Sequence, residues 1–320
     1  MVKNAPHRFL HVLAAAAAAA MIGVAWCVLA TLGLETYGLG LFVGMPFAVG
    51  LLAALAHARH GPTTFLGDVG VALLALALTA AGLLAIAVEG AICLAMALPL
   101  ALPLALAGAA AGRGLTRLGR PSPRTFGAVA LAVPLLLGAE AGADRQPVPH
   151  AVTTRVVVDA PPAAVWRRVV AFPPLAAPRS GLFRAGVAYP RSATIEGRGV
   201  GAIRRCRFST GDFVEPITVW DRPRRLAFDV TAQPAPMREL SPWGEVHPPH
   251  LDGFLRSRRG EFRLTALPGG RTLLEGTTWY ENRMWPARYW RAWTDGVIHA
   301  IHRRVLRHVA RHAERDVRAP

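Results

Sequence analysis

The sequence predicts two unlike parts: a helical membrane region over residues 1–144, and an α+β domain over residues 152–316 whose curved antiparallel sheet surrounds a long C-terminal helix. Two observations about composition predict this division. The excess of apolar residues in the 320-residue chain lies before residue 143, in blocks too long for a soluble core. From residue 145 onward there are 29 of the 35 arginines, together with β-rich segments separated by short turns.

Five apolar segments in the first part have lengths near the 20 or so residues that a membrane-crossing helix needs. They are residues 9–34, 39–58, 65–88, 91–111 and 125–143. The first is longer than the apolar core of a cleaved signal peptide, which has about 7 to 15 residues, so we expect it to be retained. The fifth is short. The chain is therefore expected to be an integral membrane protein with the lipid bilayer as its partner.

Basic residues in the connections indicate the orientation. Lys3 and Arg8 precede the first segment, Arg59 follows the second, and four arginines lie between residues 112 and 125. Because cytoplasmic connections collect lysine and arginine, five spans place the N-terminus in the cytoplasm. We expect a bacterial inner-membrane protein with its soluble domain on the periplasmic face. If the fifth segment lies on the surface instead, the domain is cytoplasmic.

Acidic residues near the spans are functional candidates, since ionisable groups are costly inside a bilayer. Asp68, Glu89 and Glu140 all fall at predicted span ends. We expect them to be solvated at the interface, and the segments show no buried charge pair of the kind that a proton-coupled transporter requires.

Composition also argues against several partners. The net charge of +16 comes from 35 arginines and a single lysine without any long basic run, which does not favour nucleic-acid binding. Three cysteines, Cys27, Cys93 and Cys206, have neither disulfide-framework nor zinc spacing. No P-loop or dinucleotide motif is present. We therefore expect no cofactor and no metal.

The second part begins with a proline-containing linker over residues 145–151. A β-branched strand over residues 153–158 and a helix over residues 163–172 follow. Further strands are predicted at residues 192–196, 200–209, 212–221, 225–232, 256–266 and 272–282. Most are joined by short turns, so they are antiparallel. A proline-rich insertion occupies residues 233–253, and a helix over residues 286–314 ends the domain.

Three segments carry a resemblance to a known family: VVVDAPPAAVWRRV from Val156, the stretch from Gly197 to Val230, and GGRTLLEGTTWYE from Gly269. Together with the order of elements, they resemble the START-like superfamily of polyketide cyclases/dehydrases and lipid-transport proteins (SRPBCC). The resemblance covers about residues 150–315 and implies a helix-grip fold, with an apolar cavity between the sheet and the terminal helix.

Aromatic and aliphatic side chains at alternating strand positions and along one helix stripe are candidates to line that cavity. The candidates are Phe228, Trp279, Trp285, Tyr289 and Trp293. The insertion is expected to form a lid over the cavity mouth, with Trp243, His247, His250 and Asp252. His247, His250 and Asp252 offer three metal ligands but no fourth, so we expect no metal there.

Catalytic candidates are Glu215 and Glu275, which lie within strands, and His250 in the insertion. A buried carboxylate with a raised pKa is a possible general acid or base. The alternative is that each glutamate pairs with a strand arginine such as Arg204, Arg205 or Arg263. Two histidine pairs on the terminal helix, His299/His302 and His308/His312, are expected to be solvated on its outer face.

These expectations lead to one leading function and two alternatives. The leading hypothesis is a membrane-tethered domain that binds a hydrophobic, lipid-like or polycyclic ligand without catalysis. The first alternative is an enzyme of polyketide-cyclase or dehydrase type that uses a cavity glutamate or histidine. The second is a membrane interaction or regulatory module with a filled core. An open cavity of several hundred Å3 favours ligand binding. The sequence indicates neither the ligand nor a protein partner.

Overall fold

The computed structural model describes residues 5–143 and 146–318, and they form two compact units. The helical unit comprises residues up to 145 together with 239–250 and 284–286. The second unit comprises residues 146–238, 251–283 and 287 onward. Lys3 and residue 145, where the linker was predicted to begin, lie outside the described residues.

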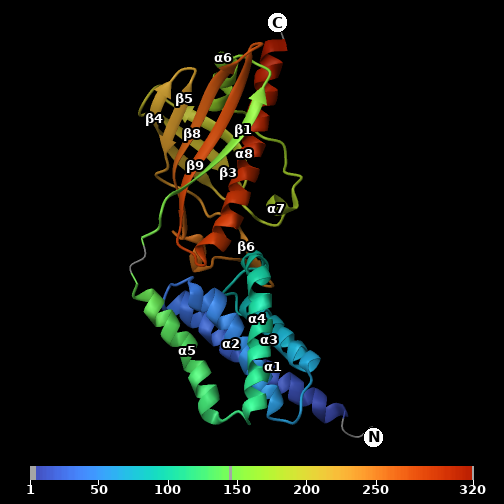
Figure 1. Ribbon diagram of the computed structural model, residues 1–320. Helices are drawn as coiled ribbons and strands as arrows, with labels where there is room; N and C mark the ends of the chain where they lie inside the picture. Colours follow the sequence, from blue (N-terminus) through green and yellow to red (C-terminus); the bar gives the residue numbers. More distant parts are fainter. Residues whose placement is uncertain (1–4, 144–145, 319–320) are drawn as a thin grey trace. The chain divides into compact units, whose positions relative to one another are not determined.

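The helical unit contains five long apolar helices, as the sequence predicted (Figure 1). Their bounds are α1 (Ala5–Val28), α2 (Met45–Ala58), α3 (Phe65–Ala85), α4 (Ala91–Leu118) and α5 (Pro123–Ala141). Two π-helical turns, η1 (Leu29–Gly33) and η2 (Gly40–Gly44), extend α1 and precede α2. With these turns, all five helices are long and apolar enough to cross a membrane. The chain therefore has the character of an integral membrane protein.

Helices α2 and α4 approach each other closely because glycines face the partner backbone. A Cβ atom at Gly50 would collide with the backbone of Ala105, and one at Gly108 would collide with the backbone of Phe47. Small residues at a helix interface are the usual means of close packing in membranes, where burial from water contributes little to helix association.

The three acidic candidates Asp68, Glu89 and Glu140 are buried, which corrects the expectation that they are solvated. Asp68 is 1% exposed and accepts hydrogen bonds from Arg113 at 2.8 Å and Thr63 at 3.1 Å. Glu140 accepts from the backbone N–H groups of Leu39 and Gly40, both at 2.8 Å. The hydropathy pattern missed these contacts because the partners are distant in sequence.

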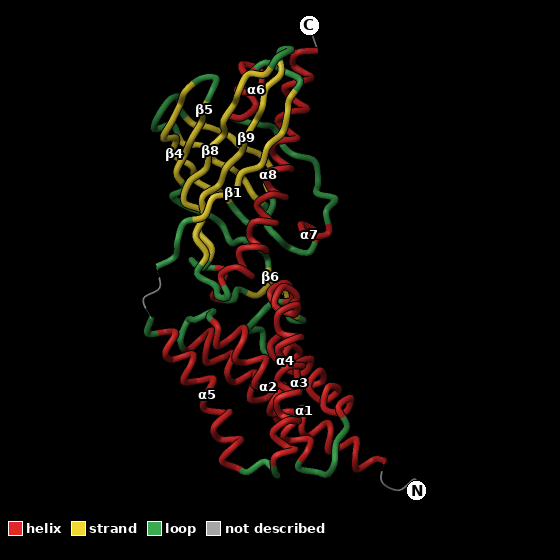
Figure 2. Tube along the Cα trace, viewed as in Figure 1, coloured by secondary structure: helices red, strands yellow, loops and turns green. Residues whose placement is uncertain are grey.

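The second unit is built on a seven-stranded antiparallel sheet in the order β1-β9-β8-β5-β4-β3-β2 (Figure 2). The strands are β1 (His150–Val158), β2 (Pro190–Glu196), β3 (Ile203–Phe208), β4 (Asp212–Asp221), β5 (Arg225–Asp229), β8 (Leu255–Leu267) and β9 (Arg271–Asn282). β3 starts later than predicted, because Gly199 and Gly201 have φ near +89° and +88° and form the turn that precedes it. The predicted antiparallel fold is confirmed.

The long helix α8 (Ala287–Arg318) packs along the sheet, and the short helix α6 (Pro162–Val170) packs beside it (Figure 1). The indole rings of Trp166 on α6 and Trp220 on β4 meet edge to face at 5.5 Å in the core. Arg168 on α6 and Asp316 near the end of α8 form an ion pair with an Nε···Oδ2 distance of 2.8 Å. The core therefore lies between the sheet and these two helices. A further short helix, α7 (Gly181–Arg184), follows α6 in the chain.

The predicted insertion contains a hairpin of β6 (Glu239–Ser241) and β7 (Gly244–Val246), followed by the 3-10 turn η3 (Pro249–Leu251). The hairpin belongs to the helical unit. Its Glu239 carboxylate accepts hydrogen bonds from the backbone N–H groups of Ile92 at 2.9 Å and Cys93 at 2.7 Å. Glu239 therefore satisfies donors that the first turn of α4 leaves unpaired.

Candidate functional site

The second unit has a cavity of about 120 Å3 between the sheet and α8. Residues from β3, β4, β5, β8 and β9 form one wall, and Ile298, Ile301, His302, Val305 and Leu306 of α8 form the other. The volume is smaller than the several hundred Å3 that a drug-sized ligand occupies, and it is similar to an engineered cavity of about 150 Å3 that holds benzene. The core is therefore neither filled nor widely open.

Five phenylalanine rings give the cavity an apolar lining. They are Phe172, Phe208, Phe213, Phe228 and Phe262. Gly260 of β8 makes room for one of them, because a Cβ atom there would collide with the ring of Phe228. The local sequence thus places a glycine where the aromatic ring lies against the strand.

A buried ion pair lies in this apolar wall. Arg204 is 2% exposed and Glu215 is 5% exposed, and the Arg204 guanidinium donates to the Glu215 carboxylate. The guanidinium also lies 5.3 to 5.6 Å from the ring centres of Phe172, Phe228 and Phe262. Burial raises the pKa of the Glu215 carboxyl, and the neighbouring arginine opposes that rise. This pairing with a strand arginine is the predicted alternative to an acid or base role for Glu215.

Arg259 supplies a donor without a partner. Its Nε atom is buried and has no hydrogen-bond partner in the part of the chain that the structure describes. The guanidinium carbon lies 5.1 Å from the ring centre of Trp279, and Nη2 lies 3.6 Å from the Glu261 carboxylate. The next residue, Gly260, faces the Phe228 ring in the cavity, so strand alternation places the Arg259 side chain on the opposite face of the sheet, beside Trp279 and Glu261.

His302 points inward from α8, which corrects the expectation that it is solvated on the outer face. Its Nε2 lies 2.8 Å from the Thr278 hydroxyl and its Nδ1 lies 3.1 Å from the Thr154 hydroxyl. Burial lowers the pKa of His302 to about 4. The imidazole is therefore neutral near pH 7. His308, from the second predicted pair, is also buried, with Nε2 3.1 Å from the Pro173 carbonyl oxygen.

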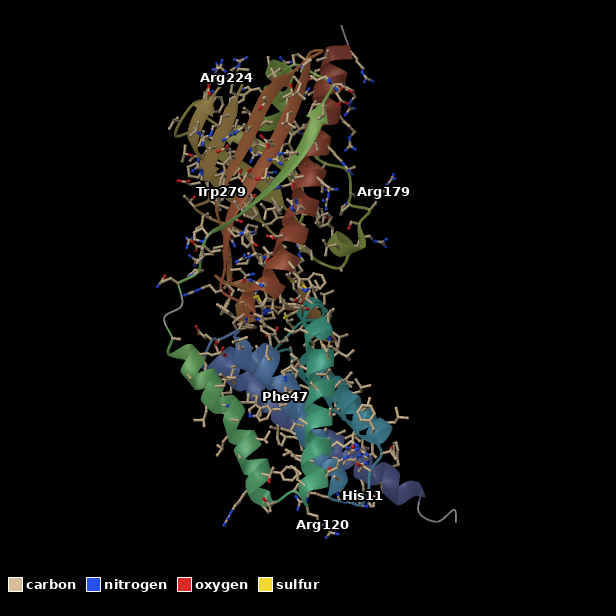
Figure 3. The ribbon with its side chains drawn as sticks, viewed as in Figure 1. His11, Phe47, Arg120, Arg179, Arg224 and Trp279 are labelled. Carbon is tan, nitrogen blue, oxygen red and sulfur yellow. The ribbon has the colours of Figure 1, made fainter. Side chains whose placement is uncertain are left out.

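Of the five predicted cavity residues, only Phe228 lines this cavity. Trp279 on β9, labelled in Figure 3, lies under the guanidinium of Arg259 instead. Trp285 precedes α8, is 37% exposed and donates its backbone N–H to the Tyr37 carbonyl oxygen at 2.9 Å. Tyr289 and Trp293 lie on the first two turns of α8, whereas the lining residues start at Ile298. The predicted stripe is therefore placed too early along the helix.

The other predicted site residues are dispersed. Glu215 lines the cavity, whereas Glu275 pairs with Arg155 at 2.6 Å and does not line it. His250 belongs to the helical unit, as do Trp243 and His247 of the predicted lid. Trp243 donates its indole N–H to the carbonyl oxygen of Ala85 at 2.5 Å. Asp252 lies in the second unit, beside a polar pocket formed largely by residues 230–235 and 251–258.

One known protein family matches the second unit of the chain. The sequence model of the family described as "Polyketide cyclase / dehydrase and lipid transport" matches residues 149–314. This chain belongs to that family. The match covers the whole sheet, α6 and most of α8, and leaves α1 to α5 outside it. The predicted resemblance is confirmed.

Solved structures that this chain resembles have low sequence identity to it. The Zhui aromatase/cyclase from Streptomyces sp. R1128 is 19% identical over 54% of this chain and 98% of its own, with a TM-score of 0.34. Truncated norcoclaurine synthase from Thalictrum flavum is 12% identical over 56% of this chain and 99% of its own, with a TM-score of 0.34. The comparison with curated proteins finds no match.

Proposed function

We propose that the family domain binds a hydrophobic, lipid-like or polycyclic molecule without catalysis, with a ring-sized part of it between the sheet and α8. The observation that carries the proposal is the cavity beside α8, which phenylalanine rings line and which contains the buried Arg204–Glu215 pair and the His302 imidazole. A molecule with an apolar body and a polar group would fit this lining. The 120 Å3 volume sets the size of the enclosed part.

Tethering to a membrane supports a lipid-like ligand. Five helices long enough to span a bilayer precede the domain, so the domain stays close to the medium in which apolar molecules concentrate. One basic residue, Arg59, follows α2. Four more lie near the end of α4, in the connection to α5 and at the start of α5: Arg113, Arg117, Arg120 and Arg124. With five crossings, this distribution favours a cytoplasmic N-terminus and a domain on the opposite face, which is the periplasmic face in a bacterial inner membrane.

A second candidate function is acid–base catalysis of the cyclase or dehydrase type, and His302 favours it. The imidazole lines the cavity and is neutral near pH 7, because burial lowers its pKa to about 4. A neutral imidazole can accept a proton from a bound molecule, and Thr278 and Thr154 fix the ring orientation. Turnover of a bound ligand by the wild type, lost in His302→Gln while binding persists, would favour this candidate.

Native mass spectrometry of the full-length protein released from nanodiscs tests the binding proposal. Ile298→Trp places a larger side chain at a lining position of α8 and so reduces the space that a ligand needs. Its matched control is Ala292→Trp, because Ala292 is exposed on the same helix.

The wild type and Ala292→Trp are expected to carry a small apolar molecule, and Ile298→Trp is expected to lose most of it. The proposal fails if the wild type carries no such molecule. It also fails if both variants retain the molecule with equal occupancy.

A further inference from the structure

A second cluster of reactive side chains lies in the helical unit. One potential ligand atom from each of Glu89, Cys93 and His250 lies within 4.8 Å of the other two. All three side chains are buried, with exposed fractions of 3%, 6% and 5%. The cluster combines carboxylate, thiol and imidazole, which is the donor set that zinc-type ions take in proteins.

The local fold brings these residues together from distant parts of the chain. Glu89 lies just before α4, Cys93 lies in the first turn of α4, and His250 lies in η3 after the β6–β7 hairpin. The carboxylate of Glu239 fixes that hairpin to α4 through two backbone N–H groups. Gly90 permits this close approach, because a Cβ atom there would collide with the Glu239 side chain.

Two atoms of the cluster have no hydrogen-bond partner among the described residues: Oε2 of Glu89 and Nδ1 of His250. They face each other at 3.4 Å. The other carboxylate oxygen of Glu89 is occupied, because it accepts the Tyr37 hydroxyl at 2.8 Å. Buried polar atoms are nearly always paired, so two such atoms aimed at each other point to a missing binding partner.

We propose that Glu89, Cys93 and His250 bind a divalent transition-metal ion of the zinc class. Tetrahedral bond lengths of about 2.0 to 2.3 Å place zinc ligands roughly 3.3 to 3.8 Å apart, and the distance between Nδ1 of His250 and Oε2 of Glu89 already has this value. Ion binding would replace the thiol proton of Cys93. The ion would also offset part of the negative charge of two buried carboxylates, those of Glu89 and Glu239.

The second ring nitrogen of His250 supports this assignment. Nε2 lies 3.9 Å from the Glu239 carboxylate. Imidazoles that bind metals through one nitrogen usually direct the other toward a carboxylate or a carbonyl oxygen, which fixes the ring orientation. At 3.9 Å the Glu239 carboxylate attracts the ring but does not form a hydrogen bond with it, while its oxygens hold the first turn of α4.

The ion would have an open coordination position. Glu89 and Cys93, together with Tyr37 and Cys27, line an apolar cavity of about 330 Å3 between helices of this unit. Sites with three protein ligands and an open position bind water or a substrate, whereas structural zinc sites have four protein ligands. The fourth position is thus available to an oxygen or sulfur atom of an apolar molecule. This site is separate from the cavity beside α8.

Cobalt titration of the metal-depleted full-length protein in nanodiscs tests the proposal, because thiolate-bound Co²⁺ has a charge-transfer absorption in the near ultraviolet. Cys93→Ser removes the thiolate ligand. Its matched control is Cys27→Ser, since Cys27 is also buried and lines the same cavity but lies outside the cluster. Competition with a zinc chelator gives the affinities of the wild type, Glu89→Gln and His250→Gln.

We expect one Co²⁺ per wild-type chain, with a charge-transfer band that Cys93→Ser loses and Cys27→Ser keeps. Zinc affinity should fall at least about tenfold in Glu89→Gln and His250→Gln. No charge-transfer band in the wild type would overturn the proposal. A band that survives in Cys93→Ser would equally overturn it. The wild-type measurement is decisive even if a variant does not fold.

Discussion

Arg204 and Glu215 occupy directly opposed positions on β3 and β4, and their side chains form an ion pair within the apolar wall of the cavity. Three phenylalanine rings surround the guanidinium. A pair of this kind adds little net stability compared with apolar side chains of similar size, but removing one partner leaves an uncompensated buried charge. Replacing Arg204 or Glu215 alone is therefore expected to destabilise the domain.

Glu215→Leu should destabilise the family domain by about 3 to 5 kcal/mol, because it leaves Arg204 buried without a carboxylate. Arg204→Met combined with Glu215→Leu should recover most of that loss. Hydrogen exchange of the sheet amides in the full-length protein measures both effects. Equal destabilisation by the single and double variants would show that the ion pair itself is not the cause.

Sequence patterns predicted the sheet well, because turn residues and strand alternation are local. The segments 212–221 and 272–282 coincide with β4 and nearly coincide with β9. The same patterns could not predict which face of α8 meets the cavity. His302 was assigned to the outside because arginines surround it in sequence, yet its ring bonds to hydroxyls of β1 and β9.

The stability of the domain should fall as pH decreases from about 6.5 to about 4. Burial lowers the pKa of His302 and of His308 to about 4, whereas both have a pKa near 6.5 in the unfolded chain. The unfolded chain therefore takes up these protons first, and the loss for His302 alone is roughly 3 kcal/mol. Well above pH 7 both histidines are neutral in the folded and in the unfolded chain, so they do not make the stability depend on pH there.

Hydrogen exchange of α8 at a series of pH values, corrected for intrinsic exchange rates, measures this dependence. The double variant His302→Gln/His308→Gln should have a clearly shallower slope between pH 6.5 and 4 than the wild type. An unchanged slope would show that carboxylates alone cause the acid sensitivity.

Asp68→Asn should destabilise the helical unit. Asp68 is 1% exposed and pairs with Arg113 at 2.8 Å and with His57 at 3.1 Å, so the variant leaves the arginine charge without its counter-ion. We expect a loss of roughly 3 kcal/mol or more. The thermal transition of the purified protein in nanodiscs should fall accordingly, whereas Asp229→Asn, at an exposed position, should leave it unchanged.

The proposed orientation predicts that the C-terminus lies outside the cytoplasm. A C-terminal alkaline phosphatase fusion in a bacterial host should be active, and the equivalent green fluorescent protein fusion should be dark. The reverse result would mean that one of the apolar helices does not cross the membrane. The first candidate would be α5, because the segment predicted there is short.

The two candidate sites differ in how much sequence reasoning could contribute. Phe228 was predicted because strand alternation places it on the inward face, and Glu215 because it lies within a strand. The lining residues of α8 were missed, because the predicted aromatic stripe begins earlier along the helix. The cluster of Glu89, Cys93 and His250 was missed because the insertion that contains His250 was interpreted as a lid, and only tertiary structure brings it to α4.

The central claim is that an apolar molecule lies between the sheet and α8, and filling that space tests it most directly. Ile301→Phe adds volume at a lining position, whereas Ala292→Phe adds an aromatic ring at an exposed position of the same helix. The measurement is mass spectrometry of small molecules extracted from each purified full-length protein. The account predicts a molecule present in the wild type and Ala292→Phe and strongly depleted in Ile301→Phe. Equal amounts in all three proteins, or none in the wild type, would contradict it.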